Sequence, residues 1–266
     1  MRRSESGQAT VEWSALFLVV TLLFAGFAYG VTRAETWRLG ENLIHSITCA
    51  VGGECAEPDA LERAYGEQTA SLVRRYSPNV VYERRSAELP IDFRRCRKLE
   101  CSNGPDRAAE IERTSAGLPV TAFTRVVDHR AAAGPLYIQY WFYYPESFTG
   151  AIGRLLGAFA HDWPGYHKDD WEGLQLRLGP DGSVSARATA HGGYGSGWGN
   201  WTGWYRVSGG SHAGQLVRRP GDERTTRSPG IELVPLEPLR DTDLQRFVVT
   251  PPWRKAVYTD PESASS

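Results

Sequence analysis

The segment at residues 136–145 reads LYIQYWFYYP, and the segment at residues 169–178 reads DDWEGLQLRL. The first holds six aromatic residues among the eight at positions 137–144, so it is apolar on both faces of an extended chain. Because side chains alternate between the two faces of a strand, this pattern predicts a central strand that is buried on both sides. In the second segment three leucines alternate with polar residues, which predicts a neighbouring strand with one inward face.

Short runs of β-branched and aromatic residues surround these two segments and are separated by Gly, Pro and Asp turns. A helical pattern appears among them only around residues 152–159. Many short strands without interleaved helices indicate a mainly β fold, and we predict an antiparallel β-sandwich over residues 70–258 with a polar tail at 259–266. The runs expected to form strands are 79–82, 120–127, 136–144, 174–178, 184–190, 203–207, 215–218 and 247–250.

The N-terminal region contains an uncharged run of 19 residues, WSALFLVVTLLFAGFAYGV, at positions 13–31. As a helix it would span roughly 28 Å, enough to cross the hydrocarbon core of a bilayer. Arg2 and Arg3 precede it, so the positive-inside rule places a leader at residues 1–12 in the cytoplasm and the rest outside. We therefore predict a single-pass membrane protein; a buried soluble helix is the alternative.

The four cysteines all follow the apolar run. An even number in an exported chain predicts disulfides, and the local pairs would be Cys49–Cys55 and Cys96–Cys101. Three connectivities are open, and a zinc site with loosely spaced ligands is the alternative. The first pair lies in a predicted helical stalk at residues 32–69, where apolar residues recur at helical spacing.

The net charge of the chain bears on which classes of binding partner the composition indicates. Thirty basic and 31 acidic residues give a net charge of −1, so nothing global indicates a nucleic-acid partner. Hydrophobic residues make up 41% of the chain, which excludes disorder along its whole length.

Asp170 and Glu172 form a candidate cation site at the start of the second segment. They continue the inward face of its leucines, where two adjacent carboxylates are unfavourable unless a cation or hydrogen-bond donors neutralise them. His167 lies three residues before Asp170. Carboxylate oxygens with one imidazole suit Ca²⁺, Mg²⁺ or Mn²⁺. A carboxylate cluster paired with arginine is the alternative.

A glycine- and tryptophan-rich segment, HGGYGSGWGNW at residues 191–201, is the candidate ligand-binding surface. Its glycines permit close approach of the backbone to a ligand, and its aromatic rings could stack on a sugar or lipid head group. The alternative is a hairpin whose tryptophans cap the sandwich. The candidate contact residues are His191, Tyr194, Trp198 and Trp201.

The sequence shows no nucleophile motif and leaves open whether the protein is an enzyme. Ser196 is flanked by glycines but lacks the G-x-S-x-G elbow. His129, His161 and His212 each stand alone and are expected to lie at the surface or to be hydrogen-bonded.

The N-terminal phrase GQATVEWSALFLVV, residues 7–20, resembles the TadE-like and Flp-type pilins of tight-adherence systems. Glu12 stands five residues after Gly7, as in their leader-peptidase signature, although Trp13 replaces their tyrosine or phenylalanine. The resemblance implies cleavage after Gly7, an apolar helix that stays on the mature chain, and Tad-type pilus machinery as a partner. An unprocessed signal anchor is the alternative.

Four phrases in order, RRYSPNVVYERRSAELPIDF, LYIQYWFYYP, DDWEGLQLRL and TAHGGY, resemble the vacuolar protein sorting family numbered sixty-two. Residues 166–172 and 190–194 also resemble two motifs of the necrosis- and ethylene-inducing toxin family, GHRHDWE and AHGGY. That second resemblance implies a β-sandwich that holds a divalent cation and recognises sphingolipid head groups. The departures from the first toxin motif are Tyr166, Lys168 and Asp169.

Carried over position by position, the toxin resemblance implies that His167, Asp170 and Glu172 are metal ligands. The family's further acidic ligand corresponds to Ser147, and Glu146 is the acid one residue away.

We expect a membrane-anchored, extracytoplasmic, pilin-like protein whose metal-containing β-sandwich recognises a glycan, a lipid head group or a pilus partner. One alternative is a metal-dependent hydrolase or cytolysin-like protein in which Asp170 or Glu172 activates a metal-bound water. Another is a purely structural minor pilin.

Overall fold

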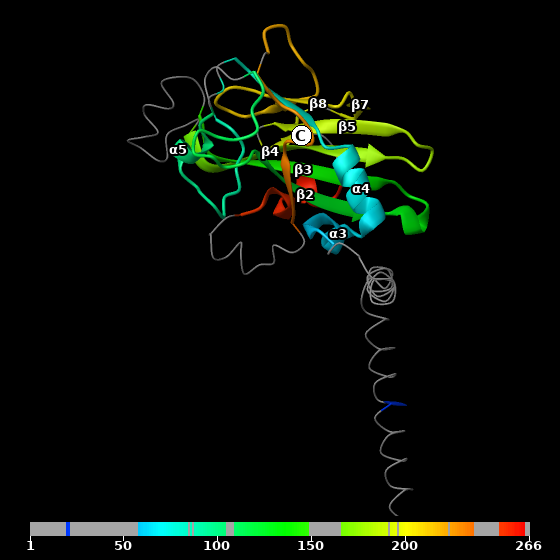
Figure 1. Ribbon diagram of the computed structural model, residues 1–266. Coiled ribbons are helices and arrows are strands. Elements are labelled where there is room, and N and C mark those ends of the chain that lie inside the picture. Colours follow the sequence, from blue (N-terminus) through cyan, green and yellow to red (C-terminus); the bar gives the residue numbers. More distant parts are fainter. Residues whose placement is uncertain are drawn as a thin grey trace, which may run out of the picture. The chain divides into compact units, whose positions relative to one another are not determined.

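The computed structural model of the chain describes residues 20–21, 58–84, 86, 88–104, 109–148, 166–190, 192–195, 197–222, 224–236 and 250–263. The chain divides into two compact units, Met1–Pro58 and Asp59–Ser266. Nearly all of the described residues belong to the second unit (Figure 1).

The predicted leader, membrane span and stalk lie largely outside the described residues. Within the span only Val20 and Thr21 are described, and both are helical. None of the helices described is long and apolar enough to cross a membrane.

The second unit begins with two short helices, α3 (Ala60–Tyr65) and α4 (Glu67–Arg75). Asp59 caps α3, because its carboxylate accepts from the backbone N–H groups of Leu61 and Glu62, and the Glu62 side chain accepts from the Asp59 N–H in return. Gly66 separates the helices with a φ of 76°.

A seven-stranded sheet forms most of this unit. Its strands pair antiparallel except β11 with β2, which are parallel. In spatial order they are β11 (Glu232–Pro235), β2 (Thr121–Asp128), β3 (Leu136–Phe148), β4 (Tyr166–Leu178), β5 (Val184–Ala190) and β6 (Gly193–Tyr194), with β7 (Gly199–Asn200) also paired to β5.

A second sheet has four strands in the order β10 (Arg224–Thr226), β1 (Asn79–Tyr82), β8 (Trp204–Val207) and β9 (Gly214–Gln215). Strands β1 and β8 are parallel and the other two pairs are antiparallel. The prediction of a mainly β fold is thus confirmed, but both sheets are mixed rather than purely antiparallel.

The remaining described elements are single turns. They are α5 (Leu99–Ser102), η1 (Arg130–Ala132), η2 (Pro252–Arg254) and α8 (Ala256–Thr259).

Strand β3 is buried on both faces, as its sequence predicts, and all ten residues from Leu136 to Pro145 are buried. Its even-numbered residues join a core shared with α3, α4 and the four-stranded sheet, where Phe142 stacks on Tyr205 with ring centroids 5.1 Å apart. Trp141 and Tyr143 join a second core on the opposite face.

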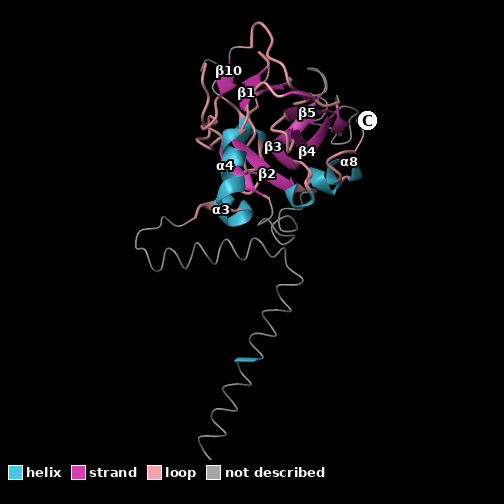
Figure 2. Cartoon of the chain, turned by 90° about the vertical axis from the view of Figure 1, so that its right-hand side faces the viewer, coloured by secondary structure: helices cyan, strands magenta, loops and turns pink. Residues whose placement is uncertain are grey.

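The C-terminal residues cover part of this opposite face of the seven-stranded sheet. Tyr258 of α8 is buried there, and α8 lies on the other side of strands β2–β4 from α4 (Figure 2). Residues 259–263 belong to the stretch expected to be a polar tail, and here they hydrogen-bond to the sheet. Arg187 donates to the carbonyls of Pro261 and Ser263 at 2.6 and 2.7 Å.

Candidate functional site

The candidate site lies where β4 begins. Asp170 and Glu172 are 5% and 4% exposed and pair in register with Tyr144 and Phe142 of β3. They therefore share the face that the leucines of β4 turn toward the core between the sheets.

His212 lies between two buried carboxylates. Its Nδ1 is 2.9 Å from Oδ2 of Asp170, and its Nε2 is 3.0 Å from Oε2 of Glu88. The ring is completely buried and stacks on Tyr144, with centroids 3.8 Å apart and an interplanar angle of 3°. The structure thus places an imidazole where the sequence suggested either a metal ion or an arginine.

The two carboxylates keep this imidazole charged. Burial alone lowers the pKa of His212, but the hydrogen bonds and charges of Asp170 and Glu88 outweigh burial and raise its pKa to about 9. The cluster therefore holds an imidazolium between two carboxylates at neutral pH. Because both ring nitrogens face carboxylates, His212 balances charge and is not positioned as a base for a substrate.

Glu172 has a different partner. Its Oε2 accepts a hydrogen bond from the hydroxyl of Thr189 on β5, and that hydroxyl oxygen accepts from the N–H of Gly173 at 2.7 Å. A hydroxyl donor from the next strand thus helps to satisfy this buried carboxylate.

His167 meets Asp170 at the solvent-facing side of the cluster. Its side chain is 59% exposed, and its Nε2 lies 3.5 Å from Oδ1 of Asp170. Glu146 lies opposite Lys168 and accepts from the hydroxyl of Tyr166 at 3.1 Å. The structure therefore brings His167 to Asp170, whereas the described contact of Glu146 is with Tyr166.

The described ranges contain no group of three or more acidic, histidine or cysteine side chains arranged to hold a metal ion. His167 Nε2 and Asp170 Oδ1, 3.5 Å apart, are within ion-pair distance of one another.

Among the described residues expected to bind a ligand, Tyr194 and Trp198 lie against the same arginine, and Tyr194 is not exposed. Tyr194 is completely buried, with the guanidinium of Arg187 3.4 Å from its ring centroid. Trp198 is half-buried and lies 4.6 Å from the same guanidinium. Trp201 packs against the core between the sheets, and His191 lies outside the described residues.

One of the two expected disulfides is confirmed. Cys96 and Cys101 are bonded, with their Cα atoms 6.2 Å apart. Cys49 and Cys55 lie outside the described residues.

Glu88 and His212 are the members of the cluster that the sequence does not reveal. Each lies in a connecting segment far from Asp170 along the chain, and neither belongs to a periodic pattern. The sequence offers one indirect indication: a buried carboxylate such as Asp170 needs a charged or hydrogen-bond-donating partner, so some residue must supply it.

Comparisons of the chain with protein-family models, with curated proteins and with solved structures find no match.

Proposed function

We propose that this chain is an exported, membrane-anchored binding module. In this proposal the two sheets form a β-sandwich that holds a divalent cation, Ca²⁺, Mg²⁺ or Mn²⁺, and uses it to recognise a glycan or a lipid head group. The observation that carries the proposal is the approach of His167 to Asp170 at the solvent-facing side of the Asp170–His212–Glu88 cluster.

The ligand chemistry supports a cation at this position. Asp170 is buried and would supply a carboxylate oxygen, while His167 is mostly exposed and would supply a ring nitrogen. Glu172 follows on the same face of β4 as a further carboxylate, and Glu146 belongs to the proposed set by resemblance alone. When bound, the ion would offer coordination positions to hydroxyl or phosphate oxygens, which glycans and lipid head groups carry.

The proposed location rests on two features. The apolar run at residues 13–31 is long enough to anchor the chain, with its N-terminus in the cytoplasm. The Cys96–Cys101 disulfide suits an oxidising compartment outside the cytoplasm. The pilin-like leader adds Tad-type pilus machinery as the proposed assembly partner.

Manganese binding to the full-length protein in detergent micelles tests the proposal. After treatment with chelator and dialysis, we expect calorimetry to show about one Mn²⁺ bound per chain. Replacing His167 by glutamine should weaken binding at least tenfold, about 1.4 kcal/mol, because one of the two closest ligands is lost.

His129→Gln is the matched control. His129 is also exposed, but it lies beyond the end of β2 that pairs with Leu136, whereas Asp170 pairs with Tyr144 farther along β3. Its removal should leave Mn²⁺ affinity unchanged. The same proteins are then applied to a glycan array and to anionic vesicles, with Mn²⁺ or with chelator. Absence of Mn²⁺ binding, or equal affinity in the wild type and His167→Gln, would refute the proposal.

A further inference from the structure

His167 and Asp170 meet although a regular strand would separate them. They are three positions apart on β4, so in regular geometry their side chains would leave from opposite faces. Between them Asp169 has a φ of 56°, in the left-handed region. The pairing with β3 omits Asp169 and the opposite Pro145, and keeps the same register on either side, with Asp170 opposite Tyr144 and Lys168 opposite Glu146. The local irregularity of β4 thus lies between the two residues.

Three hydrogen bonds hold the Asp169 carboxylate. Arg97 donates from Nη2 to Oδ2 at 2.5 Å and from Nε to Oδ1 at 3.2 Å, in a two-pronged arrangement. The Tyr143 hydroxyl donates to Oδ1 at 2.6 Å. Left-handed backbone is unfavourable for most L-residues and is best tolerated by Gly, Asn and Asp. The three hydrogen bonds to the Asp169 carboxylate therefore favour a backbone conformation that a regular strand does not adopt.

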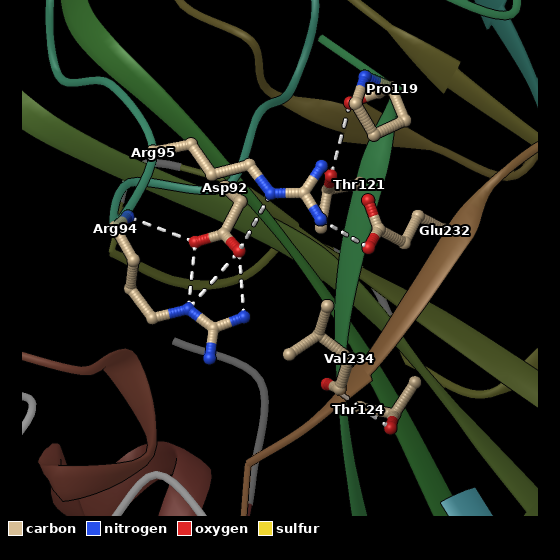
Figure 3. Close-up of polar contacts among 8 residues, drawn as sticks. All are labelled: Asp92, Arg94, Arg95, Pro119, Thr121, Thr124, Glu232 and Val234. Carbon is tan, nitrogen blue, oxygen red and sulfur yellow. Dashed lines mark hydrogen bonds and ion pairs between the residues drawn. The ribbon is translucent and has the colours of Figure 1, made fainter. Parts of the chain in front are cut away.

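Arg97 lies in a loop that a disulfide and neighbouring ion pairs hold in place. It follows Cys96 directly, within the loop closed by the Cys96–Cys101 disulfide. Before this loop, Asp92 accepts four hydrogen bonds from Arg94, and Arg95 donates to Glu232 of β11 at 2.7 Å (Figure 3). The segment that carries Arg97 is therefore attached to the seven-stranded sheet on one side and closed by a disulfide on the other.

We propose that Arg97, Tyr143 and Asp169 form a clamp that sets the separation of His167 and Asp170 and so determines the affinity of the cation site. These three are positioning residues, because none of them is proposed to touch the cation. The inference rests on the proposed cation site for its functional meaning, whereas the clamp itself is a property of the chain without a cation.

Substitutions that change the charge near the site distinguish the clamp from a purely electrostatic effect, because the two explanations predict different changes in Mn²⁺ affinity. Arg97→Gln removes a positive charge near the site, which by charge alone would strengthen cation binding. If the clamp operates, the same change weakens Mn²⁺ binding about tenfold, because Asp169 is released. Asp169→Gly removes a negative charge, which by charge alone would weaken binding. Glycine adopts left-handed backbone freely, so under the clamp the affinity stays within about threefold of the wild type.

The test uses the full-length protein in micelles, with Mn²⁺ affinity measured by calorimetry and folding checked by circular dichroism. Asp169→Gly combined with Arg97→Gln should restore affinity relative to Arg97→Gln alone. Asp169→Val should weaken binding, because a β-branched residue disfavours positive φ. Arg130→Gln is the matched control, since Arg130 forms a comparable ion pair with Asp128, 2.6 Å long, beside the β2–β3 connection. Arg130→Gln should leave the Mn²⁺ affinity unchanged.

A second measurement requires no cation. In chelator, hydrogen–deuterium exchange of amides at residues 166–170 should rise several-fold in Arg97→Gln and stay at the wild-type rate in Arg130→Gln. If Arg97→Gln binds Mn²⁺ as tightly as the wild type or more tightly, the clamp is refuted. If the wild type binds no Mn²⁺, the cation proposal fails, and the exchange rates decide the clamp: a rise supports it and unchanged rates overturn it.

Discussion

At His212, burial and hydrogen bonding act on the imidazole pKa in opposite directions. Burial lowers the pKa, but the bonds to Asp170 and Glu88 prevail and raise it from 6.5 to about 9. Because the folded state has the higher pKa, this stabilisation is complete below pH 6.5 and is lost as the pH rises through about 9. A difference of this size corresponds to about 3 kcal/mol.

We therefore expect the free energy of unfolding to fall with rising pH through this group. Urea unfolding of the full-length protein in chelator should show a loss of about 3 kcal/mol between about pH 6 and about pH 10, after subtraction of the same curve for His212→Asn. Asparagine suits this position because His212 has a left-handed φ of 53°. His129→Asn, at an exposed histidine, should retain the wild-type pH dependence. Identical curves for the wild type and His212→Asn would contradict the assignment.

The sequence pattern identifies some residues of the buried cluster and not others. Strand alternation is a local property, so it correctly places Asp170 and Glu172 on an inward face. His212, which pairs with Asp170, and Glu88, which pairs with His212, come from connecting segments that only the fold brings together, so no spacing along the chain identifies them. The same limit applies to Asp169, because a left-handed residue within a strand leaves no periodic signal.

At the scale of elements, Gly173 permits the close pairing of β3 and β4. A Cβ atom at this position would lie 2.3 Å from the carbonyl oxygen of Tyr140 and 3.0 Å from the ring of Trp141. Gly173→Ala should therefore push the two longest strands apart and lower the free energy of unfolding by about 1–3 kcal/mol, measured by urea unfolding.

The matched control for this substitution is Gly199→Ala on β7. A Cβ atom there would meet no atom within 4 Å, so the change should stay within about 0.5 kcal/mol of the wild type. Equal stability of Gly173→Ala and Gly199→Ala would mean that β3 and β4 adjust without loss.

The strand pairings divide into those that sequence can predict and those that it cannot. Strands β3 and β4 stand out because one is apolar on both faces and the other alternates. The parallel pairs β1–β8 and β11–β2 join segments that are distant in the chain. Strands β1, β8 and β11 are each four residues long, and β2 pairs with β11 over only four residues. Nothing local specifies a partner for so short a strand, so an antiparallel arrangement throughout was the wrong prediction for these two pairs.

At the scale of the whole molecule, the C-terminal segment completes a sheet face that would otherwise hold buried polar groups without partners. Arg187 is 2% exposed and Gln175 is 1% exposed. Gln175 donates to the Pro261 carbonyl at 2.8 Å, and Arg187 donates to the same carbonyl and to that of Ser263. Polar composition suggested a tail, but carbonyl groups belong to every residue, so composition says nothing about their role as acceptors.

Truncation separates these two interpretations of the C-terminus. A chain that ends at Tyr258 lacks both acceptor carbonyls and the Glu262 carboxylate that pairs with Arg177 at 3.3 Å. The buried donors of Gln175 and Arg187 then lose their partners, so we expect the free energy of unfolding in urea to drop by about 2–4 kcal/mol. A chain that ends at Ser263 keeps every one of these contacts and should unfold as the wild type does. If both truncated chains match the wild type, water replaces the lost carbonyls at no cost, and residues 259–263 are a tail after all.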